Sequence, residues 1–299
     1  MTARRRIILT GATGLIGKAL SKRLTTLGYD VVPFRSRYDG PGGMNHLTGK
    51  IDREGLEGAY AVIHLAGESI AQRWNEAAKE RILASRRDGT RLLATTLAGL
   101  KQKPEVFVSM SGINRYGLRR TEILDESAAV SAEGFLPAVT EAWETATLPA
   151  SEGGIRTVLL RTSLVLSSTG GGLKKMLPAF RLGLGGPIGG GRQQMSWIGL
   201  PDLVELIVWS LDNPRVRGPL NAVAPQPVTQ AEFARTLGAV LRRPSFLPMP
   251  GWAIGLLFGQ MGRETVLGDL AVRPAVALDG GFRFAKPDLA SALREALGE

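Results

Sequence analysis

Residues 8–17 read ILTGATGLIG and place Gly11, Gly14 and Gly17 between a short apolar run and a segment with helical spacing. Gly11 permits a tight turn out of a strand, Gly14 lets the backbone approach a diphosphate, and Gly17 lets the helix pack close to the sheet. The helix that follows would present free N–H groups and a partial positive charge to that diphosphate. The stretch therefore predicts a dinucleotide-binding turn, and a glycine turn without a ligand is the alternative.

Strand-like and helix-like segments alternate through the first half of the chain. Apolar runs typical of strands occupy 6–9, 30–34, 61–66, 106–109 and 156–166, and helical patterns occupy 15–27, 76–100 and 138–146. Near-continuous apolar strands separated by helices indicate parallel strands that are covered on both faces. We therefore predict the α/β class, with a Rossmann-like doubly wound parallel sheet.

The second half of the chain has a different composition. Glycine-rich stretches at 170–172 and 183–191 precede a predicted helix at 200–211 and a predicted strand at 218–223, and prolines and short apolar helices dominate after that. We interpret this half as a smaller C-terminal α+β lobe at the carboxyl edge of the sheet, where ligands bind in such folds. The expected division is an NADP-binding Rossmann-like domain over 1–224 and a substrate-side domain over 225–299, with 167–199 contributing to the small lobe.

Composition excludes several kinds of chemistry. The 299 residues are 44% hydrophobic and 21% charged, which is ordinary for a globular protein. There is no cysteine, so disulfide scaffolds, thiolate metal sites and cysteine nucleophiles are excluded. The only histidines, His46 and His64, sit in unrelated segments, and we expect no metal site. No signal peptide is recognisable and no stretch reaches the roughly 18 apolar residues of a membrane span, so we expect a cytoplasmic protein.

The chain is basic, with 37 Lys and Arg against 27 Asp and Glu and a formal net charge of +10. A basic balance favours anionic partners such as nucleotides, phosphates, nucleic acid or a membrane surface. The basic residues are scattered, however, and no Lys/Arg block or aromatic-interleaved basic stripe appears. We therefore expect a small-molecule substrate as the partner, with no nucleic acid and no membrane, and either a monomer or a homodimer.

The end of the second predicted strand points to the form of the cofactor. An NAD site places Asp or Glu there to accept from the ribose 2′-OH. Residues 31–37 read VVPFRSR, so Arg35 and Arg37 stand at that place and no carboxylate does. Arginine pairs with a 2′-phosphate through charge-assisted hydrogen bonds. We predict NADP(H) as the cofactor; ordinary surface charges are the alternative for the two arginines.

Seven segments that span nearly the whole chain carry a family resemblance. They are TGATGLIG (10–17), VIHLAGESI (62–70), RILASRRDGTRLL (81–93), SGINRYG (111–117), EAWE (141–144), GGPIGGGRQQMSWIGLPDLVELI (185–207) and ALDGGFRFAKPDLASALREAL (277–297). With them the chain resembles the extended short-chain dehydrogenase/reductase superfamily, and more narrowly its NAD-dependent epimerase/dehydratase-like branch with a distinctive C-terminal domain. The resemblance implies that the diphosphate lies among Gly11, Thr13, Gly14, Leu15, Ile16 and Gly17, the adenosine ribose beside Arg35, and both riboses along Leu65, Ala66 and Gly67.

The chain departs from that superfamily at the groups that perform its chemistry. A serine or threonine usually holds the substrate oxygen, a tyrosine transfers the proton, and a lysine four residues later lowers the pKa of the tyrosine. None of the four tyrosines here has a lysine four residues on. The tyrosine position falls near Phe135, the lysine position near Val139, and the serine position on Gly112. The usual proton-transfer pair is therefore absent.

Ser111 and Tyr116 are the catalytic candidates that stand nearest to the expected positions. A tyrosine titrates near ~10 unless a cation lowers its pKa, and Arg86 or Arg115 would have to supply that cation. The alternatives are that Tyr116 is a packing residue and that Ser111 makes hydrogen bonds at a strand end. Other candidate acids are the carboxylates Glu68, Glu133 and Glu141.

A second cluster of polar residues follows the glycines at 189–191. Arg192, Gln193, Ser196 and Trp197 offer a cation, an amide, a hydroxyl and an aromatic face, as the wall of a substrate pocket would. The alternative is a structural turn in which Trp197 is core and Asp202 caps the next helix. The resemblance implies a small polar substrate that is sugar-like or linked to a nucleotide.

Two functions remain open at this point. One is an NADP-dependent oxidoreductase or epimerase, in which hydride passes at nicotinamide C4 and the protein supplies orientation and electrostatics. The other is a non-catalytic NADP(H)-binding sensor or regulatory scaffold, which the missing Tyr/Lys pair would explain directly.

Overall fold

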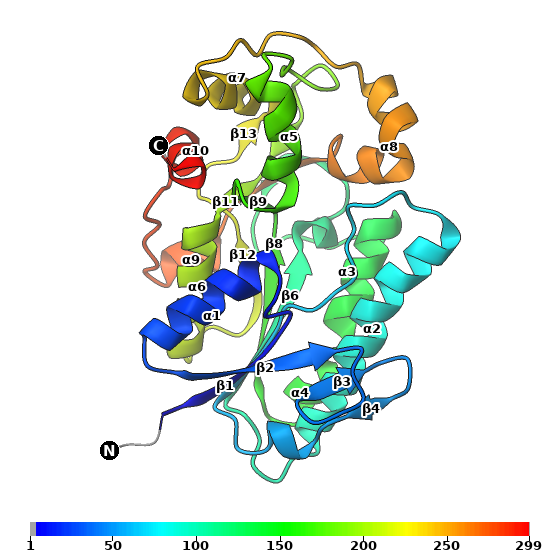
Figure 1. Cartoon of the computed structure of the whole chain (residues 1–299), viewed down its shortest axis with the longest axis vertical. Helices are drawn as coiled ribbons and strands as arrows, with labels where there is room; N and C mark the ends of the chain where they lie inside the picture. The colour runs from blue at the N-terminus through cyan, green and yellow to red at the C-terminus, as the bar shows by residue number, and fades with distance from the viewer. Residues whose placement is uncertain (1–3, 299) are drawn as a thin grey trace.

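The structure, a computed structural model, describes residues 4–298 and has an eight-stranded sheet at its centre (Figure 1). The strand order is β12-β8-β6-β5-β1-β2-β3-β4. Their bounds are β1 (Arg6–Thr10), β2 (Asp30–Ser36), β3 (Gly43–Asn45), β4 (Lys50–Ile51), β5 (Ala61–His64), β6 (Val106–Gly112), β8 (Arg156–Thr162) and β12 (Gly218–Ala222). All neighbours pair in parallel except β3 and β4. The winding reverses between β1 and β5, which confirms the doubly wound sheet and opens a crevice at their carboxyl ends.

Helices cover both faces of this sheet (Figure 1). They are α1 (Leu15–Thr26) and α6 (Leu200–Asp212) on one face, and α2 (Glu76–Ala98), α3 (Phe135–Thr145) and α4 (Leu148–Glu152) on the other. Within β1, Ile7 and Leu9 pack in the same hydrophobic cluster as α1 and α6, whereas Ile8 packs in the cluster that contains α2 and α4. Because side chains alternate along a strand, a strand that is covered twice has to be apolar at every position.

The smaller α+β lobe is built from segments that are distant in the sequence. Its elements are β9 (Leu164–Leu166), α5 (Gly171–Arg181), β10 (Gln194–Met195), β11 (Trp197–Gly199), β13 (Val228–Thr229), α7 (Gln230–Val240) and α10 (Leu289–Leu297). One hydrophobic cluster joins Leu173 and Trp197 to Phe233 and Leu293. The chain therefore leaves the sheet after β8, builds part of the lobe, returns for α6 and β12, and leaves again.

The remaining elements lie beside the sheet, and all except η1, which precedes β5, lie between the sheet and this lobe. They are η1 (Glu54–Leu56), η2 (Ile113–Tyr116), β7 (Arg119–Leu124), α8 (Gly251–Thr265), β14 (Asp269–Val272) and α9 (Ala275–Asp279). The carboxylate of Glu264 on α8 accepts from the backbone amides of Phe135 and Leu136 at 3.2 and 2.8 Å. Gly134 precedes α3 and has no side chain to cap it, so a residue of the C-terminal lobe satisfies the first amides of α3.

One predicted strand differs from the structure. The apolar run 156–166 forms two strands, because β8 ends at Thr162 and β9 begins at Leu164. β8 stays in the central sheet, whereas β9 pairs in parallel with β11 of the small lobe. The polar pair Thr162 and Ser163 thus marks the exit from the sheet. No helix within residues 4–298 is long and apolar enough to cross a bilayer.

Candidate functional site

The glycine turn between β1 and α1 is too closely packed for side chains at two of its glycines. Gly11 has a φ of +69°, and a Cβ there would lie 2.8 Å from the carbonyl carbon of Leu65. A Cβ at Gly17 would collide with the carbonyl oxygen of Gly11, to which the Gly14 amide donates at 3.0 Å. Close backbone approach therefore requires glycine at positions 11 and 17.

The N-terminus of α1 is left open by its own residues. Gly14 is the N-cap and offers no side chain, and the first turn of α1 contains no acidic residue. Thr13 is exposed in front of this turn, and the side chain of Leu15 lies against Gly170 at the start of α5. Uncapped N–H groups at a helix N-terminus form an anion-binding position. The residues present therefore fit a diphosphate.

Thr10 fixes the next strand of the crevice against the glycine turn. Its hydroxyl oxygen accepts from the amides of Leu65 and Ala66 at 3.1 and 3.2 Å and lies 2.7 Å from Nδ1 of His64. Because the oxygen already accepts twice, the hydroxyl proton is assigned to the bond with Nδ1, which leaves the proton of the neutral ring on Nε2. Complete burial lowers the pKa of His64 to about 4, so the ring is neutral.

Only one of the two ring nitrogens of His64 is paired. Its Nδ1 is bonded to Thr10, but Nε2 is buried and has no partner within residues 4–298. Buried polar atoms are nearly always paired, with protein, water or ligand. The atom lies on β5, the strand beside β1 across the crevice.

Arg35 and Arg37 lie at the end of β2, where the sequence places them, but their surroundings differ. The guanidinium of Arg35 is exposed and stacks 3.5 Å from the ring centre of Tyr38. Arg37 has a φ of +57° and pairs with the Glu68 carboxylate at 2.7 Å. Burial alone would raise the pKa of Glu68, but its hydrogen bonds to Arg37 and Gln72 lower it. Arg35 is thus the guanidinium without a carboxylate partner, and Arg37 ties the end of β2 to the loop after β5.

Arg86 supports that loop from α2. Its Nη1 donates to the carbonyl oxygens of Glu68 and Ile82 at 3.0 and 3.1 Å, and its guanidinium lies 4.8 Å from the ring centre of Trp143. A Cβ at Gly67 would approach this guanidinium within 3.3 Å. Burial lowers the pKa of Arg86 to about 10. Arg86 therefore holds Gly67 and Glu68 in place rather than serving Tyr116.

Ser111 belongs to a buried ionic cluster at the end of β6. Its hydroxyl donates to Oε1 of Glu144 at 2.7 Å. Arg161 on β8 donates two hydrogen bonds of 2.8 Å to the same carboxylate. Nε of Arg115 lies 3.6 Å from its Oε2. Glu144 was not among the sequence candidates, although it ends the quoted segment EAWE. Its side chain is 10% exposed, so the cluster is largely screened from water.

Tyr116 lies behind this cluster and is fully buried. Its hydroxyl donates to Oδ1 of Asn221 at 2.8 Å, and burial raises its pKa. The cation beside its ring is Arg161, at 4.8 Å, and neither of the two candidates, Arg86 and Arg115. These contacts are those of the packing alternative for Tyr116. Phe135, near the expected tyrosine position, packs edge-on against Trp74 at 4.8 Å.

Polar atoms without partners gather where β8 ends. Arg161 Nη1, Thr162 Oγ1 and Ser163 Oγ are buried and unpaired within the described residues. In the sheet, Arg161 lies opposite Ser111 on β6, and Thr162 lies opposite Gly112, the expected serine position. Leaving such atoms unpaired costs free energy, which a ligand or water would recover. Sequence reasoning missed Thr162 and Ser163, although two hydroxyls inside an apolar run were a usable signal.

The four candidates for a substrate wall are mostly engaged in structural contacts. Ser196 donates to the carbonyl of Leu270 at 3.0 Å and accepts from the amide of Val272 at 2.9 Å. Gln193 donates to the carbonyl of Ile188 at 2.9 Å, and Trp197 is buried in the small-lobe cluster. Arg192 is the exposed member of the set.

The proposed cap at Asp202 is wrong. Asp202 lies in the first turn of α6, but it does not cap that helix. Its two carboxylate oxygens accept from the amides of Ala285 and Lys286 at 2.8 and 3.1 Å. The carboxylate thus anchors the C-terminal segment, a partnership across more than 80 residues that a local capping pattern does not reveal.

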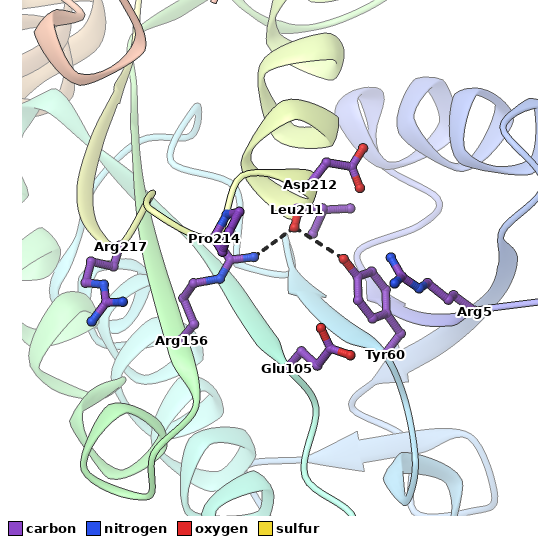
Figure 2. Close-up of a pocket in the computed structure, with 8 residues that line it drawn as sticks. All are labelled: Arg5, Tyr60, Glu105, Arg156, Leu211, Asp212, Pro214 and Arg217. Carbon is purple, nitrogen blue, oxygen red and sulfur yellow. Dashed lines mark hydrogen bonds between the residues drawn. The ribbon is translucent and has the colours of Figure 1, made fainter. Parts of the chain in front are cut away.

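Two cavities open at the opposite, amino edge of the sheet. The first encloses about 420 Å³ and is lined by Arg5, Tyr60, Glu105, Arg156, Leu211, Asp212, Pro214 and Arg217 (Figure 2). The second encloses about 630 Å³ and lies beside the first, around the end of α6. Arg156 donates to the carbonyls of Ser210, Leu211 and Val216 at 2.8 to 2.9 Å, so it satisfies the C-terminus of α6. These cavities lie away from the glycine turn. Arg156, a cation of the first cavity, already uses its hydrogen bonds to stabilise the end of α6.

The described part of the chain has no cluster of side chains suited to bind a metal ion. Residues 4–298 contain no group of three or more histidine, aspartate or glutamate side chains placed to hold a metal ion. The groups gathered at the carboxyl edge are an open helix N-terminus, a free guanidinium and several unpaired hydroxyls. They can bind phosphates and orient a polar ligand.

Family models match two parts of the chain. Residues 7–222 match the NAD dependent epimerase/dehydratase family, and residues 249–296 match a domain of unknown function, DUF1731. Among curated proteins, the human epimerase family protein SDR39U1 is 36% identical over 294 residues, covering 97% of this chain and 99% of that protein. The epimerase family protein YfhF of Bacillus subtilis is 33% identical over 299 residues, covering 98% of each.

Solved structures with this fold include close matches. The crystal structure of human SDR39U1 with NADPH has a TM-score of 0.89 and 35% identity, and the match covers 98% of this chain and 99% of that one. The crystal structure of the nucleoside-diphosphate sugar epimerase from Corynebacterium glutamicum has a TM-score of 0.81 and 31% identity, and the match covers 99% of this chain and 59% of that one.

Proposed function

This chain belongs to the NAD dependent epimerase/dehydratase family, and on that premise we propose that it is an NADP(H)-binding oxidoreductase or epimerase with an atypical active site. The observation that carries the proposal is the open N-terminus of α1 beside a β2 end that bears Arg35 in place of a carboxylate. A helix N-terminus favours the diphosphate, and a guanidinium favours a 2′-phosphate over a bare ribose hydroxyl. The human relative that was crystallised with NADPH supports the same choice of cofactor.

Residues at or after the carboxyl ends of β1, β2 and β5 would hold the cofactor. Gly11, Thr13, Gly14, Leu15, Ile16 and Gly17 would surround the diphosphate, Arg35 and Arg37 would meet the 2′-phosphate, and Leu65, Ala66 and Gly67 would lie along the riboses. The bound nicotinamide supplies a hydride donor or acceptor. The chain contributes backbone amides at α1, a cation at β2 and a loop held rigid by Thr10 and Arg86.

The catalytic work of this chain would fall to the end of β6 and β8. We propose that Ser111 orients the reacting oxygen of the substrate, with Glu144 and Arg161 fixing its hydroxyl. Thr162 and Ser163 hold unpaired hydroxyls in the same region and would supply further hydrogen bonds. We leave Tyr116 out of the proposed site, because its hydroxyl is buried and donates to Asn221.

The substrate that we propose is small and polar, either sugar-like or linked to a nucleotide. One solved relative is described as a nucleoside-diphosphate sugar epimerase, which supports this class. Arg192, the exposed member of the four substrate-wall candidates, would meet a negatively charged part of the substrate. We propose the domain division accordingly: 1–224 binds the cofactor, 225–299 covers the substrate side, and 167–199 contributes to the small lobe, as the shared hydrophobic cluster favours.

Calorimetry on nucleotide-stripped protein tests the cofactor. NADPH should bind with a clearly lower Kd than NADH, because only NADPH carries the phosphate that Arg35 would meet. No heat of binding with either coenzyme, or equal affinity for both, would overturn the proposal. A panel of carbonyl compounds and nucleotide sugars, followed at the NADPH absorbance, then tests turnover.

Two observations favour a second function. The Tyr/Lys pair is missing, and the hydroxyl of Ser111 is already bonded to Glu144. Both facts suit a protein that binds NADP(H) without turnover, as a sensor or regulatory scaffold. Tight NADPH binding with no turnover across the panel would select this alternative. Turnover that is lost in Ser111→Ala but retained in Tyr116→Phe would select the enzyme.

A further inference from the structure

Two segments of the small lobe and its neighbouring helix α8 expose large apolar side chains. Nine of the 14 exposed large hydrophobic side chains lie in two short segments, 182–184 and 246–258. We call these two segments the apolar face. Its most exposed members include Phe246 at 74%, Trp252 at 73% and Leu256 at 74%. Scattered exposed leucines are normal, but a contiguous apolar patch marks an interaction surface.

The two segments of the apolar face lie side by side. The amide of Leu247 donates to the carbonyl of Gly185 at 3.3 Å, and the amide of Met249 donates to the carbonyl of Pro187 at 2.8 Å. The chain then enters α8, which stands at the edge of the small lobe, far from β3 and β4 (Figure 1). Ile254 anchors α8 in the interior, whereas Trp252 and Leu256, four residues apart, share an outward side.

The surroundings of the apolar face carry charge of one sign. Residues 171–201 and 233–263 contain no Asp or Glu, and each stretch contains four Lys or Arg. Those nearest to the apolar face are Arg181, Arg242, Arg243 and Arg263, and all four are exposed. None of them takes part in an ion pair within the described residues. Projecting tryptophan and leucine bordered by unpaired arginines are typical of helices that lie in a membrane interface.

We propose that the apolar face docks on an anionic bilayer surface, with Trp252 and Leu256 entering the boundary between headgroups and acyl chains and the bordering arginines against lipid phosphates. Side chains that project from a helix suit a deformable lipid surface. A second copy seated on the same face would oppose these arginines with identical ones, which like-charge repulsion disfavours. Such a contact is peripheral and needs no spanning helix. It departs from the expectation of no membrane partner, which rested on the scattered placement of basic residues along the sequence.

Vesicle flotation with the full chain tests this proposal. Vesicles of phosphatidylcholine mixed with phosphatidylglycerol should carry the protein to the top of the gradient, and phosphatidylcholine alone should not. Binding should weaken with added salt, because exposed charges are screened. The double variant Arg242→Gln/Arg243→Gln should bind less tightly, by roughly fivefold for each arginine lost.

Matched substitutions separate the apolar face from general charge effects. Trp252→Glu and Leu256→Glu should each reduce flotation by at least about tenfold, since a carboxylate replaces an inserting apolar group beside anionic lipid. Leu47→Glu makes the same change at a side chain that is 72% exposed between β3 and β4, and it should leave flotation unchanged. Thermal unfolding confirms that each variant is folded.

Three results would overturn the proposal. The first is no flotation with anionic vesicles at low salt, and the second is an equal loss in Leu47→Glu and Trp252→Glu. The third is a concentration-dependent dimer in size-exclusion chromatography that Trp252→Glu dissociates, which would assign the apolar face to a second copy of this chain.

Discussion

The two edges of the central sheet carry similar polar side chains, which have hydrogen-bond partners at the amino edge and lack them at the carboxyl edge. At the amino edge, Arg156 gives its hydrogen bonds to three carbonyls and the hydroxyl of Tyr60 donates to Leu211, although cavities open around them. At the carboxyl edge, Arg161 Nη1, Thr162 Oγ1 and His64 Nε2 are buried without partners. Hollow volume alone therefore does not identify a site in this molecule. Polar atoms that still need a partner identify it better.

The largest effect is expected at Glu144, which Arg161 and Ser111 hold inside the carboxyl edge. Glu144→Ala leaves the Arg161 guanidinium buried without its carboxylate, and breaking a buried pair costs about 3–5 kcal/mol. Urea denaturation measures the loss. The matched control is Glu122→Ala, which removes an exposed partner of Arg120 and should cost far less stability, because solvent screens an exposed ion pair. Equal losses would mean that the buried cluster does not stabilise this edge.

The next effect is the pH dependence that His64 contributes. The folded pKa of about 4 lies below the unfolded value of 6.5, so the unfolded chain binds the proton more readily. Stability is therefore complete above pH 6.5 and falls as the pH drops toward 4, by up to about 3 kcal/mol. Urea midpoints across this range measure it. His64→Gln should flatten this part of the profile, and an unchanged slope would refute the assignment.

A somewhat smaller effect concerns Arg35 as the selector of the cofactor. Arg35→Asp replaces a cation by an anion beside the expected 2′-phosphate, and hydrogen bonds to charged groups are worth about 1.5–3 kcal/mol. We expect the Kd for NADPH to rise about 10- to 100-fold with little change for NADH. Arg37→Gln is the comparison, because Arg37 is already paired with Glu68, and its effect should be smaller. If Arg37→Gln raises the Kd for NADPH more than Arg35→Asp does, the phosphate contact belongs to Arg37.

The smallest effect is expected at the amino edge. Arg156→Met removes hydrogen bonds to the end of α6 and should cost about 1–2 kcal/mol of stability while leaving the Kd for NADPH unchanged. Arg217→Met, in the same cavity, should cost less than about 0.5 kcal/mol, because it is exposed. A changed Kd in Arg156→Met would show that the amino edge influences cofactor binding.

Sequence reasoning recovered what local patterns encode. Glycines at fixed spacing and apolar runs with helices between them predicted β1, α1, β2 and the doubly wound sheet, because turn geometry and double coverage constrain neighbouring residues. The arginine at the end of β2 was found for the same reason. The order in which strands enter a doubly wound sheet follows from the fold class.

Long-range pairing was not recoverable from those patterns. Glu144 and Arg161 meet because a helix and a strand pack together, and Asp202 meets Ala285 through the return of the C-terminal segment. No periodicity links such residues. The polar pair Thr162 and Ser163 could have indicated a break in the apolar run, but nothing in the run shows that the second strand pairs with β11 outside the central sheet. The burial of Tyr116 was likewise left open, since a tyrosine fits a core and an active site equally well.

Glu264 makes the two halves of the chain mutually dependent. Its carboxylate lies on a helix more than 120 residues downstream of α3 and accepts hydrogen bonds from the first amides of α3. A truncated protein that stopped before α8 would retain every glycine and strand of the nucleotide fold and yet leave that helix frayed at its beginning. Chimaeras that exchange the C-terminal lobe among relatives would therefore have to carry a matching acceptor, and the family's two parts would be inherited together rather than shuffled as modules.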